Sequence, residues 1–338
     1  MKSIRLFSLS IIVCLSASVA VAQSSGYHVT KTFRMASPGG WDYPAVDPGS
    51  NELYLSHGSQ VNILNRTTGD SIGCIMGTTG VHGIAFADAF GKGYTSNGRT
   101  NNVSVFDLKT HAVIKQVATG TNPDWIMFDS YSKKIITSNH TAGSVTVIDP
   151  AKDEAVATIN LPGKLETIVS DGAGKLFVNV EDKNEVAVID INKNEVTAHW
   201  PLDPGEGPTG LAIDQKTKRL FVACDKQLIV MDATNGKIVS KLPIGDGCDG
   251  DAFDPSTQLI FTSNGEGTVT VIKEVSANEF KVLETIPTKR GARTIAIDEK
   301  THRLFLPTAD YEPVPADAPK NTRPKMVSGS FQVLVLEK

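Results

Sequence analysis

The feature that most restricts the fold of this chain is a short apolar motif that recurs along most of its length. A clear copy is Thr209-Gly-Leu-Ala-Ile-Asp214, and Arg293-Thr-Ile-Ala-Ile-Asp298 follows the same pattern. A repeat of this length predicts an array of similar units, although 338 residues would otherwise suggest two domains. Seven copies, spaced 40 to 44 residues apart, end at Asp47, Ala87, Asp129, Asp171, Asp214, Asp254 and Asp298.

Each repeat contains four short apolar runs separated by turns. Examples of the second, third and fourth runs are Leu259–Asn264, Val103–Asp107 and Ala112–Val117. Runs of this length, rich in Val and Ile and bounded by Gly, Asn, Asp or Pro, indicate β-strands. Four strands in about 40 residues are typical of a propeller blade. We therefore expect an all-β, seven-bladed β-propeller of four-stranded blades at about 41–80, 81–122, 123–164, 165–207, 208–247, 248–291, and 292–338 with 27–35.

The two ends of the chain predict how the ring closes. The last repeat has a third strand at Phe331–Leu336 and then ends, so its outer strand is missing. The segment His28–Phe33 has the pattern of a fourth strand. Because a propeller blade cannot bury both apolar faces alone, the ring must shut. We expect the N-terminal strand to complete the last blade.

Several segments of the repeat resemble the YVTN repeat of the YncE-like β-propellers. They are Leu53-Tyr-Leu-Ser-His57, Gly93-Tyr-Thr-Ser-Asn97 and Val269-Thr-Val-Ile272. The resemblance covers essentially the whole chain after residue 22 and implies a seven-bladed propeller. Members of that group are mostly exported, and related architectures include both enzymes and binding platforms, so no particular activity is implied.

The N-terminus has the pattern of a secretory signal peptide over residues 1–22. Lys2 and Arg5 precede an apolar run at Leu6–Leu15, and Ala20-Val21-Ala22 supplies small residues for cleavage. We expect a mature protein of residues 23–338 in the periplasm or outside the cell, without a membrane span. The net charge of −4 gives no reason to expect nucleic acid.

Aligning the blades predicts one cluster of charged side chains around the propeller axis. The second position of each inner strand should lie at one end of the axial channel, which we call the funnel rim. A ring of carboxylates with an imidazole and a guanidinium suits a divalent metal or a cationic ligand, or an acid/base pair. Solvated strand ends would give the same pattern. These positions are Asp42, His82, Asp124, Glu166, Thr209, Asp249 and Arg293.

Histidines near this column suggest a metal site, and asparagines near it suggest turns. His57 and His82, with Asp42 or Asp124 as partners, are the candidate ligands for a divalent metal. His140 aligns with glycines of other blades, which predicts that it sits at an outward loop tip. The recurring Asn97, Asn139 and Asn264 are expected to close turns by hydrogen bonding.

Other candidates lie outside the column. Asp251 takes a position that is apolar in the other blades, so we include it among the funnel residues. Cys224 and Cys248 are predicted on one face, either as a disulfide or as two unpaired thiols. The Pro-rich insertion 310–330 leaves from the funnel face and is a candidate cover for it.

Two functions remain open from the sequence. The first is a monomeric binding module whose acidic axial funnel contacts a small molecule or an envelope protein. The alternative is a metal-dependent lyase, hydrolase or oxidoreductase at the same funnel, with Arg293 neutralising an anionic substrate group. An acidic funnel disfavours nucleic acid at this face.

Overall fold

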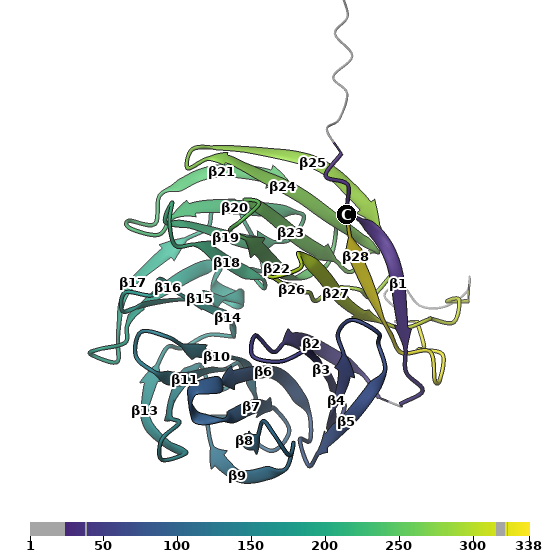
Figure 1. Ribbon diagram of the computed structural model, residues 1–338. Coiled ribbons are helices and arrows are strands. Elements are labelled where there is room, and N and C mark those ends of the chain that lie inside the picture. The colour runs from purple at the N-terminus through teal and green to yellow at the C-terminus, as the bar shows by residue number, and fades with distance from the viewer. Residues whose placement is uncertain (1–23, 38, 316–321, 323) are drawn as a thin grey trace, which may run out of the picture.

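The computed structural model describes residues 24–37, 39–315, 322 and 324–338. The predicted signal peptide, residues 1–22, lies outside the described residues. In the described part, seven four-stranded antiparallel sheets stand side by side in a ring (Figure 1). The prediction of an all-β, seven-bladed propeller is confirmed. No helix in the described segments is long and apolar enough to cross a membrane.

The first three blades follow one another in the chain. Blade one contains β2 (Trp41–Val46), β3 (Glu52–His57), β4 (Gln60–Asn65) and β5 (Ser71–Met76). Blade two contains β6 (Val81–Ala87), β7 (Lys92–Asn97), β8 (Asn102–Asp107) and β9 (Val113–Ala118), with the 3-10 turn η1 (Asp88–Phe90). Blade three contains β10 (Pro123–Asp129), β11 (Lys134–Asn139), β12 (Ser144–Asp149) and β13 (Glu154–Asn160).

The next three blades repeat this order. Blade four contains β14 (Leu165–Ser170), β15 (Lys175–Val180), β16 (Glu185–Asp190) and β17 (Glu195–Pro201), with the 3-10 turn η2 (Glu181–Lys183). Blade five contains β18 (Leu211–Asp214), β19 (Arg219–Cys224), β20 (Gln227–Asp232) and β21 (Ile238–Pro243). Blade six contains β22 (Cys248–Asp254), β23 (Leu259–Asn264), β24 (Thr268–Ser276) and β25 (Glu279–Pro287).

Blade seven is built from both ends of the chain, as predicted. It contains β26 (Ala296–Asp298), β27 (Arg303–Thr308), β28 (Gln332–Glu337) and β1 (His28–Arg34). The strand β1 pairs antiparallel with β28, from His28 opposite Glu337 to Arg34 opposite Gln332. We call this β1–β28 pairing the closing seam. Phe33 stabilises the seam, since its ring is buried beside Phe305 with ring centroids 6.5 Å apart.

Large side chains fill the space between the blades. The third residue of each second strand is fully buried, and in six of the seven blades it is aromatic. Each blade is apolar on both faces. Each of these side chains therefore packs against the neighbouring blade and buries apolar surface that a single blade would leave exposed to water. They are Tyr54, Tyr94, Ile136, Phe177, Phe221, Phe261 and Phe305.

Candidate functional site

The predicted column of charged residues does gather at one end of the axis, where the inner strands β2, β6, β10, β14 and β22 begin. The Arg293 Nε atom lies 2.5 Å from Asp249 Oδ2, and its Nη2 lies 3.2 Å from Asp42 Oδ1. His82 Nδ1 lies 2.6 Å from the other Asp42 oxygen. Blades six, seven, one and two are thus joined by one chain of charge-assisted hydrogen bonds around the funnel rim.

The remaining rim residues extend this chain through blade three to blade four. His82 Nδ1 also lies 3.7 Å from Asp124 Oδ1. His140 Nδ1 lies 2.9 Å from Glu166 Oε1. Two sets of possible metal ligands result, in each of which the ligand atoms lie within 4.8 Å of one another: Asp42 with His82 and Asp124, and Asp124 with His140 and Glu166.

Hydroxyl groups on neighbouring blades hold the rim backbone in place. Ser96 donates a hydrogen bond to the carbonyl of Asp124. Ser263 Oγ donates to the carbonyl of Arg293 at 2.6 Å, and Thr294 Oγ1 donates to the carbonyl of Asp42 at 2.7 Å. The position of each of these rim residues is therefore set by side chains from the repeat itself, which explains why residues far apart in the chain meet.

Burial and crowding set the charge states of the rim. Burial raises the pKa of the Asp124 carboxyl well above its usual range, and neighbouring carboxylates raise it further against the opposing effect of His82. Burial likewise raises the pKa of Asp249, although Arg293 opposes the shift. Burial disfavours the imidazolium of His82, but its hydrogen bond to Asp42 and the nearby carboxylates win and raise the pKa to about 9. At the rim, crowded carboxylates are therefore balanced against Arg293 and His82, and Asp124 is the carboxyl that burial favours most strongly in its neutral form.

Tyr43 lines the axial cavity next to the rim. Burial raises the pKa of its phenol well above the usual value, and the charges of four rim carboxylates raise it further. The Tyr43 ring packs edge-on against Trp125, with centroids 4.9 Å apart. The four carboxylates belong to Asp42, Asp124, Glu166 and Asp249.

His57, expected as a metal ligand, lies outside both ligand sets and makes structural hydrogen bonds instead. Both ring nitrogens are already used, since Nδ1 lies 2.6 Å from Ser37 Oγ and Nε2 lies 2.9 Å from the Gly39 carbonyl. The ring is 1% exposed and stacks on Phe331 at a centroid distance of 4.1 Å. His57 ends β3 opposite Trp41, so it fixes the loop that enters blade one and belongs to neither ligand set.

The expectation that His140 points outward is wrong. It lies at the rim against Glu166, whose carboxylate raises the pKa of the imidazole. The alignment of His140 with glycines in fact indicates a position beside the rim. A Cβ added to Gly98 would meet His82 Nε2 at 2.6 Å, and one added to Gly265 would lie 3.5 Å from Arg293 Cβ. Those glycines therefore border the rim, and a histidine at the same position reaches into it.

The recurring asparagines close turns, as predicted. Asn97 is buried and its Nδ2 donates to Asn102 Oδ1 and Ser104 Oγ, both at 2.8 Å. Asn139 and Asn264 make the equivalent pairs of bonds to hydroxyl groups on β12 and β24. These side chains satisfy the strand connections and are not free for chemistry.

Asp251 lies below the rim, in the wall of the axial channel. A cavity of about 320 Å³ runs there, lined by residues from all seven inner strands or the segments that lead into them, among them Tyr43, Trp125 and Asp251. Neither carboxylate oxygen of Asp251 has a hydrogen-bond partner among the described residues or contact with solvent. The space beside it is tight, since a Cβ on Gly210 would lie 2.9 Å from Asp251 Oδ1. Burial raises its pKa well above the usual range.

Cys224 and Cys248 are free thiols in the structure, so the disulfide that the sequence left open is not formed there. Both are buried. Burial raises the pKa of the Cys224 thiol to about 12 and that of Cys248 well above its usual value. A thiol that stays protonated at neutral pH is a poor nucleophile and metal ligand. Both cysteines therefore act as small core residues.

The insertion 310–330 begins as a two-stranded connection next to the rim. Tyr311 and Met326 form a β-bridge, and Glu312 N donates to the Lys325 carbonyl at 2.8 Å. Tyr311 packs on Trp41 with centroids 6.2 Å apart. Residues 316–321 and 323 lie outside the described residues, so the predicted cover over the funnel stays a prediction.

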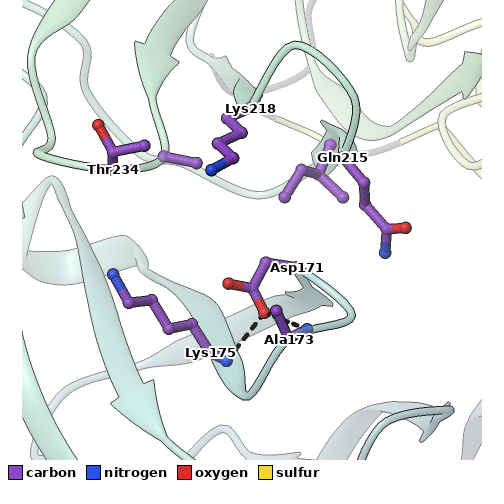
Figure 2. Close-up of a pocket in the computed structure, with 8 residues that line it drawn as sticks. Asp171, Ala173, Lys175, Gln215, Lys218 and Thr234 are labelled. Atoms are coloured by element: carbon purple, nitrogen blue, oxygen red, sulfur yellow. Dashed lines mark hydrogen bonds between the residues drawn. The ribbon is translucent and has the colours of Figure 1, made fainter.

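A separate shallow groove lies at the other ends of the inner strands, between the turns of blades four and five (Figure 2). Its volume is about 120 Å³, below the roughly 300–1,000 Å³ of small-molecule pockets. Asp171, the carboxylate drawn there, accepts hydrogen bonds from the backbone of Ala173 and Lys175, and so closes its own turn. The groove is a consequence of turn geometry, and the rim is the better candidate site.

The fold is a seven-bladed β-propeller, and charged side chains from several of its blades are in contact at the rim. Among solved structures, the chain is similar to a chain of hydrazine synthase from Kuenenia stuttgartiensis, with a TM-score of 0.69 over 84% of this chain and 95% of that chain. The sequence identity is 18%, so the likeness supports the fold alone. No family model and no curated protein sequence matches the chain.

Proposed function

We propose that this protein is an exported binding module that holds a positively charged ligand at the funnel rim. One observation carries the proposal: carboxylates from the four inner strands β2, β10, β14 and β22 meet at one end of the axial cavity, linked through Arg293, His82 and His140. β-Propellers commonly bind ligands at the end of the axial channel. A concave site with perturbed ionisable groups is the default candidate for a binding site.

The crowding of four carboxylates at the rim favours a cation over an anion. Arg293 is shared between Asp249 and Asp42, so its positive charge is already balanced by two carboxylates. Burial, and then repulsion between carboxylates, raises the pKa values of Asp124 and Asp249, and a bound cation would offset both effects. The ligand we favour is therefore a small molecule, or a side chain of an envelope partner, that brings at least one positive charge.

Export and family membership belong to the same proposal. The signal-peptide pattern of residues 1–22 supports a periplasmic or secreted location. The YVTN-like segments support a place among the YncE-like propellers. Fractionation of cells that produce the full chain, with mass analysis of the N-terminus, tests the location directly.

Calorimetric titration with spermidine and arginine methyl ester tests the rim itself. We expect Asp249→Asn and Glu166→Gln each to weaken binding at least tenfold, because each removes one buried charge that faces the ligand. Asp171→Asn is the matched control, since it removes the same charge at the opposite end of the inner strands. Binding that survives the rim substitutions, or the absence of binding by any cation tried, organic or metallic, contradicts the proposal.

A metal-dependent enzyme at the same funnel is the second candidate. The two sets of histidine and carboxylate ligands favour it. The residue expected to neutralise an anionic substrate group, Arg293, is instead paired with Asp249. This pairing weakens the argument for an enzyme. A metal-dependent enzyme requires that the rim binds a metal ion, and titration with Zn²⁺ tests whether it does.

A further inference from the structure

The two sets of possible metal ligands at the rim differ in how far their atoms are already satisfied. In the first set, Asp42 uses one oxygen for Arg293 and the other for His82. That carboxylate is therefore engaged on both sides. The hydrogen bonds to Arg293 and His82 satisfy both Asp42 oxygens without a ligand.

The second set contains buried atoms that have ion-pair neighbours but no hydrogen-bond partner: Asp124 Oδ1 lies 3.7 Å from His82 Nδ1, and His140 Nδ1 lies 2.9 Å from Glu166 Oε1. Asp124 Oδ1 and His140 Nδ1 have neither a hydrogen-bond partner among the described residues nor contact with solvent. The third member, Glu166, is 8% exposed. His140 Nδ1 and Glu166 Oε1 are 2.9 Å apart but lack the geometry of a hydrogen bond. Buried polar atoms that stay unpaired are costly, so this arrangement calls for a missing partner.

The donor set indicates what that partner is. One imidazole nitrogen and two carboxylates form a mixed nitrogen and oxygen set, which suits Zn²⁺ and other divalent first-row transition ions. Mg²⁺ and Ca²⁺ prefer oxygen ligands alone. An organic cation would need room at the atoms themselves, whereas Asp124 Oδ1 and His140 Nδ1 have no surface that water can reach.

The geometry needs only small side-chain movements to bind such an ion. The three ligand atoms lie within 4.8 Å of one another. Metal bonds of about 2.0–2.2 Å place ligand atoms roughly 3–3.5 Å apart at common coordination angles. The backbone is already fixed, because His140 N donates to the Asn122 carbonyl at 2.8 Å and Ser96 holds the Asp124 carbonyl. The His140 side chain is 20% exposed and leaves a route from the funnel.

We propose that Asp124, His140 and Glu166 bind one divalent transition-metal ion at the funnel rim, beside the Asp42–His82 pair. The inference rests on the proposed function, in that the ion is the cation that the rim takes up. Three protein ligands leave coordination positions free toward the funnel mouth. A small molecule in the funnel would then contact the metal directly.

Titration of the full chain, purified without a chelating tag and freed of metal by dialysis, tests this site. We expect one Zn²⁺ per chain by calorimetry, and Co²⁺ to give the visible absorption of a nitrogen and oxygen ligand set. Excess Mg²⁺ should not compete. Asp124→Asn, His140→Asn and Glu166→Gln should each weaken Zn²⁺ by roughly 100-fold or more, since even outer partners of metal ligands contribute about 10- to 100-fold.

Two control variants make the result specific. His199→Asn changes an exposed histidine that also faces a carboxylate, with Nδ1 2.7 Å from Glu185 Oε1, and should leave Zn²⁺ affinity unchanged. His57→Asn should also leave it unchanged. Circular dichroism and the melting temperature of each variant show whether it is folded, and the isosteric Glu166→Gln is expected to fold in any case.

The outcomes separate this inference from the function on which it rests. Failure of Zn²⁺ and Co²⁺ to bind, while spermidine binds in a rim-dependent way, overturns the metal site and leaves the binding function standing. Zn²⁺ binding that is insensitive to all three substitutions also overturns the site. Failure of every cation overturns both.

Discussion

Replacing Asp251 by valine should make the protein more stable. In the aligned position the other blades carry apolar residues, and the contact is equivalent: a Cβ on Gly83 would lie 2.9 Å from Ile126 Cγ2, just as one on Gly210 would lie 2.9 Å from Asp251 Oδ1. Valine is close to aspartate in size and branched like the isoleucines, so it fits without overpacking. The apolar residues are Pro44, Ile84, Ile126, Ile168, Leu211 and Ile295.

The size of the gain follows from the two unpartnered oxygens of Asp251. A buried polar group without a partner costs about 1–3 kcal/mol. With an unfolding entropy of about 2 cal/mol/K per residue over about 300 residues, this corresponds to a rise of roughly 2–5 °C in melting temperature. Asp251→Asn keeps polar atoms in the same place and should gain little. The reciprocal change Ile126→Asp should lose stability.

The gain should also depend on pH in a defined direction. Burial raises the pKa of Asp251 in the folded protein well above its usual range. Between the unfolded and folded pKa values the native state holds a proton that the unfolded state has released, so wild-type stability falls as pH rises above about 4. Valine removes that fall, and the difference between variant and wild type should widen from pH 4.5 to pH 8.

Urea unfolding of Asp251→Val and wild type at several pH values is the assay. A variant that is less stable than wild type at pH 7 refutes the reasoning, since Asp251 would then have partners that the structure does not contain. A stability difference that stays constant from pH 4.5 to pH 8 refutes the assigned charge state. A gain in Asp251→Asn equal to that in Asp251→Val would show that the ionisable charge of Asp251, rather than its unpartnered polar atoms, sets the effect.

Two further predictions concern the core. Burial raises the pKa of Glu274 to about 7, against a hydrogen bond of 2.7 Å from Thr217 Oγ1, so stability should decline as pH rises from about 4.5 to 7. Glu274→Gln should flatten that part of the urea-midpoint profile, and parallel profiles would contradict the assignment. Phe33→Ala should cost about 3–5 kcal/mol by thermal unfolding, because Phe33 is 6% exposed beside Phe305 in the closing seam. A loss below about 1 kcal/mol would show that the seam does not depend on this side chain.

The fold was predictable because each repeat contains the full pattern of one blade. Seven aligned copies leave little choice of blade number, and Phe331–Leu336 lacks an outer partner that only His28–Phe33 can supply. The same alignment predicted which charged side chains meet, since equivalent positions on inner strands share one end of the axis. Asp42, His82 and Arg293 are in contact although about 250 residues separate the ends of this group.

The roles of individual histidines were not predictable in the same way. His57 takes a position where other blades have a turn-closing asparagine, and it keeps that structural role with different atoms. Its chemistry suggested a ligand, and the repeat position was the better guide. For His140 the repeat position was misread, because a glycine can border a crowded rim as well as an exposed tip. Side-chain direction at a loop end depends on neighbouring blades, which one sequence does not reveal.

The seam in blade seven links completion of the ring to completion of the rim. Thr294 and Arg293 enter blade seven, and both contact Asp42 of blade one across the last gap to close. Six blades without blade seven would lack this junction, and blade seven is complete only when β1 pairs with β28. An open stack therefore presents only a fragment of the charged mouth. Ligand affinity becomes a reporter of whether the circle has shut.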